Sequence, residues 1–278
     1  MIRVRRPTGS TPAILGKKGK GGAEMRRNLK LFAQASAGEM VFAAYRDKSV
    51  RTALDDLFGR KCVFCESMLL ASQSGDIEHF RPKGRVMVHD PVTNTFAPHS
   101  GYHWLAACWH NLLIACRDCN SPRTQKDAHG VNKVFGKACF FPVTNEAHRA
   151  TGPSRLRKEN ALLLHPCIDD PEQHLEFTDD GGIRSRTRDG MVSERGSATI
   201  KYCGLDRAEL LQMRARHQRT VMASIRHIIE ALEKGQEPGR DLDDLLFMLQ
   251  RKEAYVGFTR HLVRTYLGPY FERLNLLL

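Results

Sequence analysis

The sequence lacks several features that mark common classes of protein. It has no apolar run long enough for a membrane helix, and no hydrophobic stretch follows its basic start at residues 1–7. It also lacks the Gly-x-x-x-x-Gly-Lys-Ser/Thr pattern of a phosphate-binding loop, so we do not expect it to bind ATP in that way. No internal repeat is present. These absences favour a cytoplasmic protein that is neither secreted nor embedded in a membrane.

Acidic residues are scarce relative to basic ones. Lys and Arg total 43 against 31 Asp and Glu, which gives a formal net charge of +12. The imbalance is strongest in residues 1–30, which contain nine basic residues and a single acid, Glu24. Such an excess favours a polyanionic partner such as nucleic acid, although a generally basic soluble protein would also show it.

Eight cysteines are present, but they do not indicate a disulfide-rich secreted scaffold. A chain of 278 residues can bury a core without disulfides, and no signal segment is evident. Four of the cysteines form two Cys-x-x-Cys pairs, the spacing of zinc knuckles. We predict that these four thiolates hold a structural Zn²⁺: Cys62, Cys65, Cys116 and Cys119. The other four are interpreted as small buried apolar residues: Cys108, Cys139, Cys167 and Cys203.

A second group of polar residues accompanies the cysteine pairs. Glu78 and His79 lie between the pairs, and Asn120 directly follows the last cysteine. A carboxylate, an imidazole and an amide oxygen suit a second, hard cation that stays open to water and substrate. Each residue alone is common at surfaces or helix ends, so their position beside the knuckles carries the hypothesis. Because side chains alternate along a strand, a bulge or turn is expected if Glu78 and His79 serve one site.

The pattern of apolar and polar residues predicts an α+β protein, mostly helical. Residues 23–57 have helical spacing, and a turn signal at residues 180–182 separates two short strand-like segments of a β-hairpin. We predict four parts: a basic N-terminal arm and helical segment at 1–60, a zinc-stapled core at 61–141, a connecting region at 142–200, and a C-terminal helical hairpin at 201–278.

The C-terminal part has the clearest helix signals. Asp206 with Glu209 three residues later indicates a capping box, and Gly235 is typical of the end of that helix. A second helix is expected from about Asp241 to Gly268. The two helices are expected to pack on each other and on the main body, and they could also form a docking surface for a partner.

The layout of the central segment resembles that of HNH endonucleases with a zinc-stapled ββα-metal core. The resemblance rests on a Cys-x-x-Cys pair, an acidic-His pair, a central Asn, and Cys-x-x-Cys-Asn. It implies that His79 is a general base and that Glu78 and Asn120 bind a catalytic Mg²⁺ or Mn²⁺. It also implies that Asn111, the central asparagine, orients the loop between the strands. Glu78 departs from the Asp of many members.

A closer resemblance is to the HNH proteins of Septu anti-phage systems and related retron cassettes. It is carried by residues 76–83, Trp104-Leu105 and residues 111–121, with further similarity at residues 2–7 and 164–171. It implies a defence effector that works with a PtuA-like ATPase subunit and, in retron systems, with a reverse transcriptase and its RNA/DNA product. The resemblance covers roughly residues 1–190 and hardly reaches the C-terminal helices.

Two alternatives to a DNA-cleaving enzyme follow from the same residues. A non-catalytic zinc-finger module would explain the cysteines and the charge, and would make Glu78, His79 and Asn120 coincidental. An RNA-cleaving nuclease, with tRNA as one target, would use the same site, because no residue in it is typical of 2′-hydroxyl recognition. Basic residues flank the site and collectively favour contacts with a phosphate backbone: Arg81, Lys83, Arg85, Arg117, Arg123 and Lys126.

Overall fold

The computed structural model describes residues 1–34, 40–70, 74–90 and 93–276, and contains both helices and strands. Its helices are α1 Lys20–Ala33, α2 Lys48–Phe58, α3 Arg117–Asn120, α4 Glu194–Cys203, α5 Ala208–Glu233, α6 Gly239–Met248, α7 Val256–Leu267 and α8 Phe271–Leu274. Its strands are β1 Asp76–His79, β2 Arg85–Asp90, β3 Thr95–Ser100, β4 Leu112–Ala115, β5 Arg123–Lys126, β6 Asn132–Phe135, β7 Leu175–Phe177, β8 Ile183–Ser185, β9 Thr187–Arg188 and β10 Met191–Val192.

The predicted N-terminal helical segment is divided into two helices, α1 and α2. Residues 35–39 lie outside the described part, and residues 40–43 are not helical. Asp47 begins α2, where its carboxylate accepts a hydrogen bond from the amide of Ser49. Gly59 ends α2 with a φ of 69°, a left-handed conformation that glycine adopts without strain. The buried face of α2 carries Val50 and Leu54 toward the central strands.

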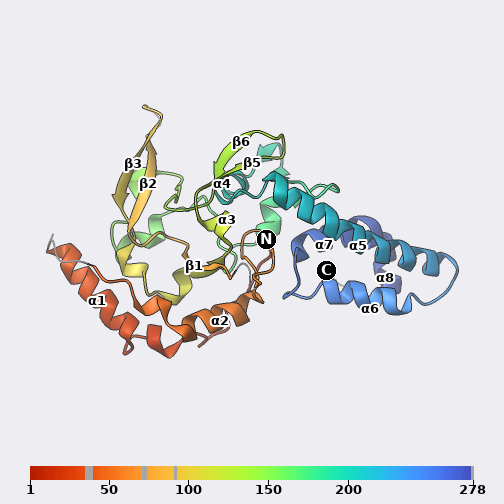
Figure 1. Cartoon of the computed structure of the whole chain (residues 1–278), viewed down its shortest axis with the longest axis horizontal. Helices are drawn as coiled ribbons and strands as arrows, with labels where there is room; N and C mark the ends of the chain where they lie inside the picture. The colour runs from red at the N-terminus through yellow and green to blue at the C-terminus, as the bar shows by residue number, and fades with distance from the viewer. Residues whose placement is uncertain (35–39, 71–73, 91–92, 277–278) are drawn as a thin grey trace.

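The centre of the chain is a pair of antiparallel strands followed by a short helix. β1 pairs with β4 in regular register, with Glu78 opposite Leu113 and His79 opposite Leu112. All four residues of β4 are buried, which fits the apolar run at 112–115. The chain between β1 and β4 forms the hairpin of β2 and β3, which projects from the body (Figure 1). The helix α3 follows β4 directly.

The predicted β-hairpin near residue 180 is confirmed. β7 pairs with β8 in antiparallel register, from Leu175 opposite Ser185 to Phe177 opposite Ile183. The turn is closed by the amide of Thr178, which donates to the carbonyl of Gly182, and Gly181 has a φ of 87°. Every sheet among the described residues has only two strands, so helices and loops supply most of the packing.

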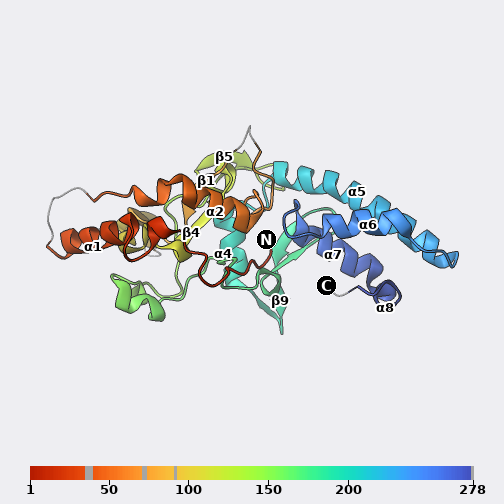
Figure 2. The same cartoon turned by 90° about the horizontal axis from the view of Figure 1, so that it is seen from below.

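The C-terminal helices form an elongated part on one side of the molecule (Figures 1 and 2). α5 packs against α6 and α7, as expected of a helical hairpin, but the predicted second helix is interrupted between Met248 and Val256. Gly235, with a φ of 70°, follows the end of α5 as predicted. The predicted capping box is wrong: the N-cap residue is Arg207, and no side chain caps the helix.

One hydrophobic cluster runs through the whole described chain. It includes Ile2, Ile114, Leu163, Ile225 and Val263, and therefore joins all four predicted parts. The boundaries of those parts remain predictions. None of the described helices is long and apolar enough to cross a membrane.

Candidate functional site

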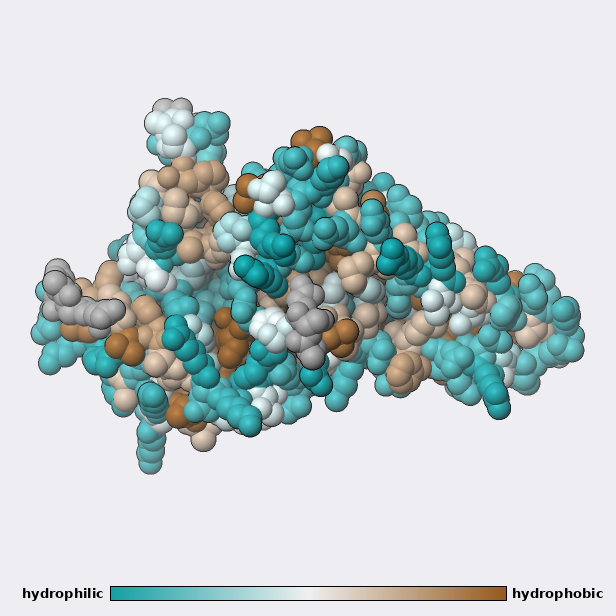
Figure 3. Space-filling view, viewed as in Figure 1, coloured by the Kyte–Doolittle hydropathy of each residue, from teal (hydrophilic) through white to brown (hydrophobic). Residues whose placement is uncertain are grey.

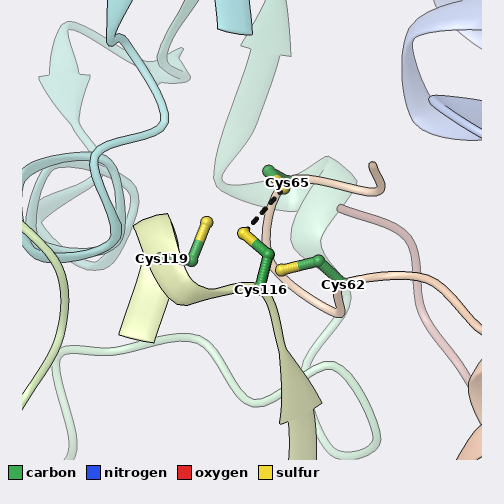
Figure 4. A group of neighbouring side chains, drawn as sticks. All are labelled: Cys62, Cys65, Cys116 and Cys119. Carbon is green, nitrogen blue, oxygen red and sulfur yellow. Dashed lines mark hydrogen bonds between the residues drawn. The ribbon is translucent and has the colours of Figure 1, made fainter. Parts of the chain in front are cut away.

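The four paired cysteines converge in one buried cluster (Figure 4). Cys62 and Cys65 come from the loop after α2, whereas Cys116 and Cys119 come from the end of β4 and from α3. Their sulfur atoms lie within 4.8 Å of one another, and the Sγ atoms of Cys65 and Cys116 are 3.7 Å apart. A tetrahedral zinc with bonds of about 2.3 Å places its sulfurs about 3.8 Å apart. The cluster can therefore hold a zinc ion, as the spacing predicts.

Backbone hydrogen bonds shape both knuckles. The amide of Glu66 donates to the carbonyl of Cys62, and the amide of Asn120 donates to that of Cys116, so each pair sits on a tight turn. Burial raises the pKa of the Cys62 thiol well above its ordinary value, so four ionised thiols need a cation among them. Arg207 balances part of the negative charge of the thiolates, because its Nη1 donates to the Sγ of Cys119 over 3.5 Å.

Glu78 and His79 line the same cleft, whose volume is about 440 Å³. The cleft is also lined by Phe42, Pro82, Lys83, Gly84, Arg85, Ala138 and Cys139. The expected bulge is absent, because the register of β1 is regular through both residues. His79 is instead the last residue of the strand, and the chain leaves the sheet there, which lets two consecutive side chains reach one cleft. Both residues are more than nine-tenths buried.

His79 is held in a defined orientation. Its Nε2 lies 2.9 Å from the carbonyl oxygen of Ala106, so Nε2 carries the proton and Nδ1 is the acceptor of the neutral ring. The Nζ of Lys83 lies 3.4 Å from Nδ1, and the ring of Tyr45 packs against the imidazole at a centroid distance of 4.6 Å. Burial, reinforced by the charge of Lys83, lowers the pKa of His79 to about 3. The imidazole is therefore neutral, the form that accepts a proton.

Glu78 is paired with a residue that the sequence analysis missed, Lys137. The Nζ of Lys137 lies 2.5 Å from Oε1 of Glu78 and 3.0 Å from the carbonyl oxygen of His79, and the lysine side chain is fully buried. Burial raises the pKa of Glu78, while the charge of Lys137 opposes that rise. The sequence offered one hint of a buried role for Lys137: it is the charged residue at the start of the otherwise apolar stretch 137–141.

Lys137 is placed by contacts with the zinc knuckle. Its amide donates to the carbonyl of Cys119, and the amide of Ala138 donates to that of Asn120. Gly136 makes this approach possible, because a Cβ there would lie 2.1 Å from the carbonyl oxygen of Ser121. The cysteine cluster and the cleft are thus connected through one short segment of backbone.

Asn111 makes contacts suited to holding the loop after β1. Its Oδ1 accepts a hydrogen bond from the amide of Arg81, and its Nδ2 donates to the carbonyls of Arg81 and Leu105. The side chain is buried and its polar atoms are occupied by backbone. These contacts match the orienting role implied by the resemblance, and its importance for catalysis remains a prediction.

Asn120 lies at the end of α3 and is not among the residues that line the cleft. Its Nδ2 donates to Oδ2 of Asp76 over 3.3 Å, which leaves Oδ1 as a donor atom for a cation. Asp76 and Glu78 are two residues apart on β1 and so share a face of the strand. Glu78 also keeps ligand capacity beyond its bond with Lys137. These oxygen donors are compatible with a hard divalent ion.

The basic residues that flank the site differ in whether their side chains are available to contact a phosphate. Arg81 is turned away into an ion pair with Glu159, at 2.8 Å, and Arg123 pairs with Asp118. Lys83 and Arg85 line the cleft itself. Arg117 and Lys126 are exposed near α3 and on β5. A phosphate in the cleft would therefore meet Lys83 and Arg85 first.

Comparison with known proteins gives two relatives and no matching family model. The chain is 38% identical over 191 residues to the Septu protein PtuB of Bacillus mycoides (strain KBAB4), an overlap of 69% of this chain and 58% of that protein. It is 24% identical over 207 residues to the Septu protein PtuA of the same strain, covering 74% of this chain and 25% of that protein. The chain thus spans about three fifths of one relative and a quarter of the other. The two similarities support a Septu-type protein.

Proposed function

We propose that the protein is a metal-dependent HNH-type nuclease that acts in Septu anti-phage defence. The observation that carries the proposal is the shared cleft of Glu78 and His79, in which His79 is neutral and directs Nδ1 toward Lys83 at the cleft wall. A zinc-binding module without catalytic activity would not require a buried carboxylate and an oriented imidazole in one cleft. The similarity to PtuB supports the defence role.

In the proposed reaction His79 acts as the general base. Nδ1 takes a proton from a water molecule, and the water oxygen attacks the phosphorus of a backbone phosphodiester while the bond to the 3′ oxygen breaks. The carbonyl of Ala106 keeps the proton on Nε2 and so keeps Nδ1 available. Lys83 and Arg85 bind the phosphate oxygens and hold the phosphorus opposite His79.

Glu78 and Asn120 would hold the catalytic Mg²⁺ or Mn²⁺. The chemistry that such an ion supplies when bound is stabilisation of negative charge on the phosphate and on the departing oxygen. Lys137 opposes the rise that burial causes in the pKa of Glu78, and its hydrogen bond fixes the position of the carboxylate. The zinc in the cysteine cluster has a structural role, because four thiolates leave it no open position.

The partners belong to the same proposal. Nucleic acid is the substrate, with DNA favoured over RNA, and a PtuA-like ATPase is the proposed subunit partner. A reverse transcriptase of the retron type remains a prediction of the sequence resemblance, since both relatives found are Septu proteins. Phage plating on cells that express the chain with and without a PtuA-like ATPase measures the defence role.

The test of catalysis is replacement of His79. His79→Ala should lower the cleavage rate of plasmid DNA, with Mg²⁺ or Mn²⁺ and the ATPase present, by a factor of about 10²–10⁴. Because His79 is buried, His79→Asn serves as a second variant with a smaller packing change. His99→Ala is the matched control, since His99 is exposed on β3. Cleavage at the wild-type rate by both His79 variants would refute the proposed base.

A further inference from the structure

Four aromatic rings form a row from the projecting hairpin to α4. The ring of His89 on β2 lies beside that of Phe96 on β3 at a centroid distance of 5.0 Å and an angle of 48°, and Phe96 meets Phe140 edge to face at 5.1 Å. Phe140 in turn lies 5.4 Å from Tyr202 on α4. The rings come from three separate parts of the chain, so the row is a product of the fold. We call these four residues the aromatic row.

The aromatic row is partly open to solvent. The Phe96 side chain is 42% exposed, His89 is exposed, and Phe140 and Tyr202 are half-buried. A row of rings that served only as core would be covered, and several adjoining apolar rings at the surface are a feature of binding sites. Figure 3 shows apolar side chains on the projecting hairpin below its hydrophilic tip.

The aromatic row passes next to the cleft at Phe140. Cys139 lines the cleft, and Phe140 is the next residue. The amide of Met87 donates to the carbonyl of Cys139, which attaches β2 to this segment. Arg85 lines the cleft from the first position of β2 and lies on the same strand face as His89, since the two are four residues apart.

Positive charge accompanies the rings. Arg85 is exposed on β2 four residues before His89, and the Nζ of Lys201 lies 5.4 Å from the centre of the Tyr202 ring at the α4 end of the row. Aromatic faces between two cations are the combination that binds single-stranded nucleic acid, because bases stack on the rings while the cations contact phosphates. The π-faces of all bases are suited to such stacking, so the surface requires no particular sequence.

We propose that the aromatic row binds unpaired bases of the nucleic acid whose backbone enters the cleft. The proposal rests on the proposed nuclease function and names its substrate: DNA or RNA with an unpaired stretch beside the cut phosphate. In a continuous duplex the bases stack on one another and do not present free faces to protein rings. Single-stranded DNA and single-stranded RNA share the required chemistry, and separate probes distinguish them.

The experiment measures binding without cleavage. Fluorescence anisotropy with no added divalent ion compares an oligothymidylate, an oligouridylate and a DNA duplex, each of about 12 nucleotides per strand. Phe96→Ala should weaken binding of the single strands by about tenfold or more, because one stacked base is lost, and should change duplex binding less than about twofold. Phe96→Trp should restore single-strand binding. Tyr202→Ala tests a second ring of the aromatic row and should also weaken binding of the single strands.

The matched control is Phe247→Ala, which removes an exposed phenylalanine from α6, far along the chain from the cleft. It should leave all three affinities unchanged. Equal single-strand affinity for wild type, Phe96→Ala and Tyr202→Ala overturns the proposal, as does an equal loss for single strands and duplex. His79→Ala should bind single strands like the wild type. If that variant still cleaves while Phe96→Ala loses single-strand binding, the proposed base is refuted and the aromatic row is supported.

Discussion

At the scale of single residues, the pair of Glu78 and Lys137 is central to the candidate site. Both are buried, their charged atoms are 2.5 Å apart, and Lys137 also contacts the backbone of His79. A buried carboxylate is stable as an ion only with such a partner. Lys137 therefore favours the charged form of Glu78 against the effect of burial, and its bond to the carbonyl of His79 fixes the end of β1.

Lys137→Met tests this pair. The substitution leaves Glu78 buried without its cation, so we expect the free energy of unfolding to fall by about 3–5 kcal/mol. Urea unfolding followed by circular dichroism measures the loss. The double variant Lys137→Met with Glu78→Gln should recover part of the loss, because it removes the unpaired charge. Lys126→Met, an exposed change on β5, is the control, and a Lys137→Met protein as stable as this control would contradict the argument.

The sequence alone identified the residues whose spacing is local, and missed those whose role depends on the fold. Two Cys-x-x-Cys pairs specify tight turns and a ligand set, so the convergence of the four cysteines was predictable. Lys137 has no such spacing: its role arises because Gly136 lets the backbone run beside Cys119. Glu78 and His79 were expected to need a bulge or a turn; the register of β1 contains no bulge, and the strand ends at His79.

At the scale of elements, the sequence predicted turns and helix ends correctly where the backbone has a positive φ, which favours glycine. Gly181 and Gly235 both have positive φ and lie at the predicted turn and helix end. Asp206 is not the N-cap of α5, because the N-cap position is taken by Arg207. The Arg207 side chain does not cap the helix and donates instead to the carbonyl of Gly204 and to the Sγ of Cys119. Within residues 23–57 Gly38 indicated a possible break in the helical run; Gly38 itself lies outside the described residues, and residues 40–43 are not helical.

The loop around His165 gives a pH-dependent prediction at this scale. Its Nε2 donates to the carbonyl of His110 in the turn before β4, and its Nδ1 accepts from the amide of Cys167. Burial lowers the pKa of His165 from 6.5 to about 4, so the fold binds the neutral ring. Its contribution to stability is complete above pH 6.5 and is lost as the pH falls toward 4.

The measurement compares wild type with His165→Gln, which cannot titrate. Between pH 6.5 and 4 the wild type should lose about 3 kcal/mol more unfolding free energy than the variant, in urea titrations at each pH. His99→Gln is the control because His99 is exposed. Parallel pH profiles for wild type and His165→Gln would show that the loop does not depend on a neutral imidazole.

At the scale of the whole molecule, the C-terminal helices are attached at the zinc knuckles. Arg207, which begins α5, contacts Cys119, while the hydroxyl of Tyr255 before α7 lies 3.1 Å from that of Ser67. The Oγ of Ser67 in turn lies 3.3 Å from the Sγ of Cys65, from which it accepts a hydrogen bond. The carboxylate of Glu66 accepts a hydrogen bond from the amide of Gly257 in α7. Deletion of the C-terminal helices would therefore also disturb the zinc site.

Arg207→Met tests whether the C-terminal helices and the zinc site depend on each other. Loss of a charged contact to a ligating sulfur is expected to weaken zinc binding by about 10- to 100-fold, because Arg207 balances thiolate charge. Competition with a chromophoric chelator measures the affinity, and hydrogen exchange measures the first turn of α5. Exchange there should rise in Arg207→Met and in zinc-free wild type, while the distal contacts of α5 with α6 stay protected. Arg219→Met, an exposed change on the same helix, should release zinc like the wild type. If Arg207→Met binds zinc as tightly as the wild type and the first turn of α5 exchanges no faster, the contact between Arg207 and Cys119 does not couple α5 to the zinc site.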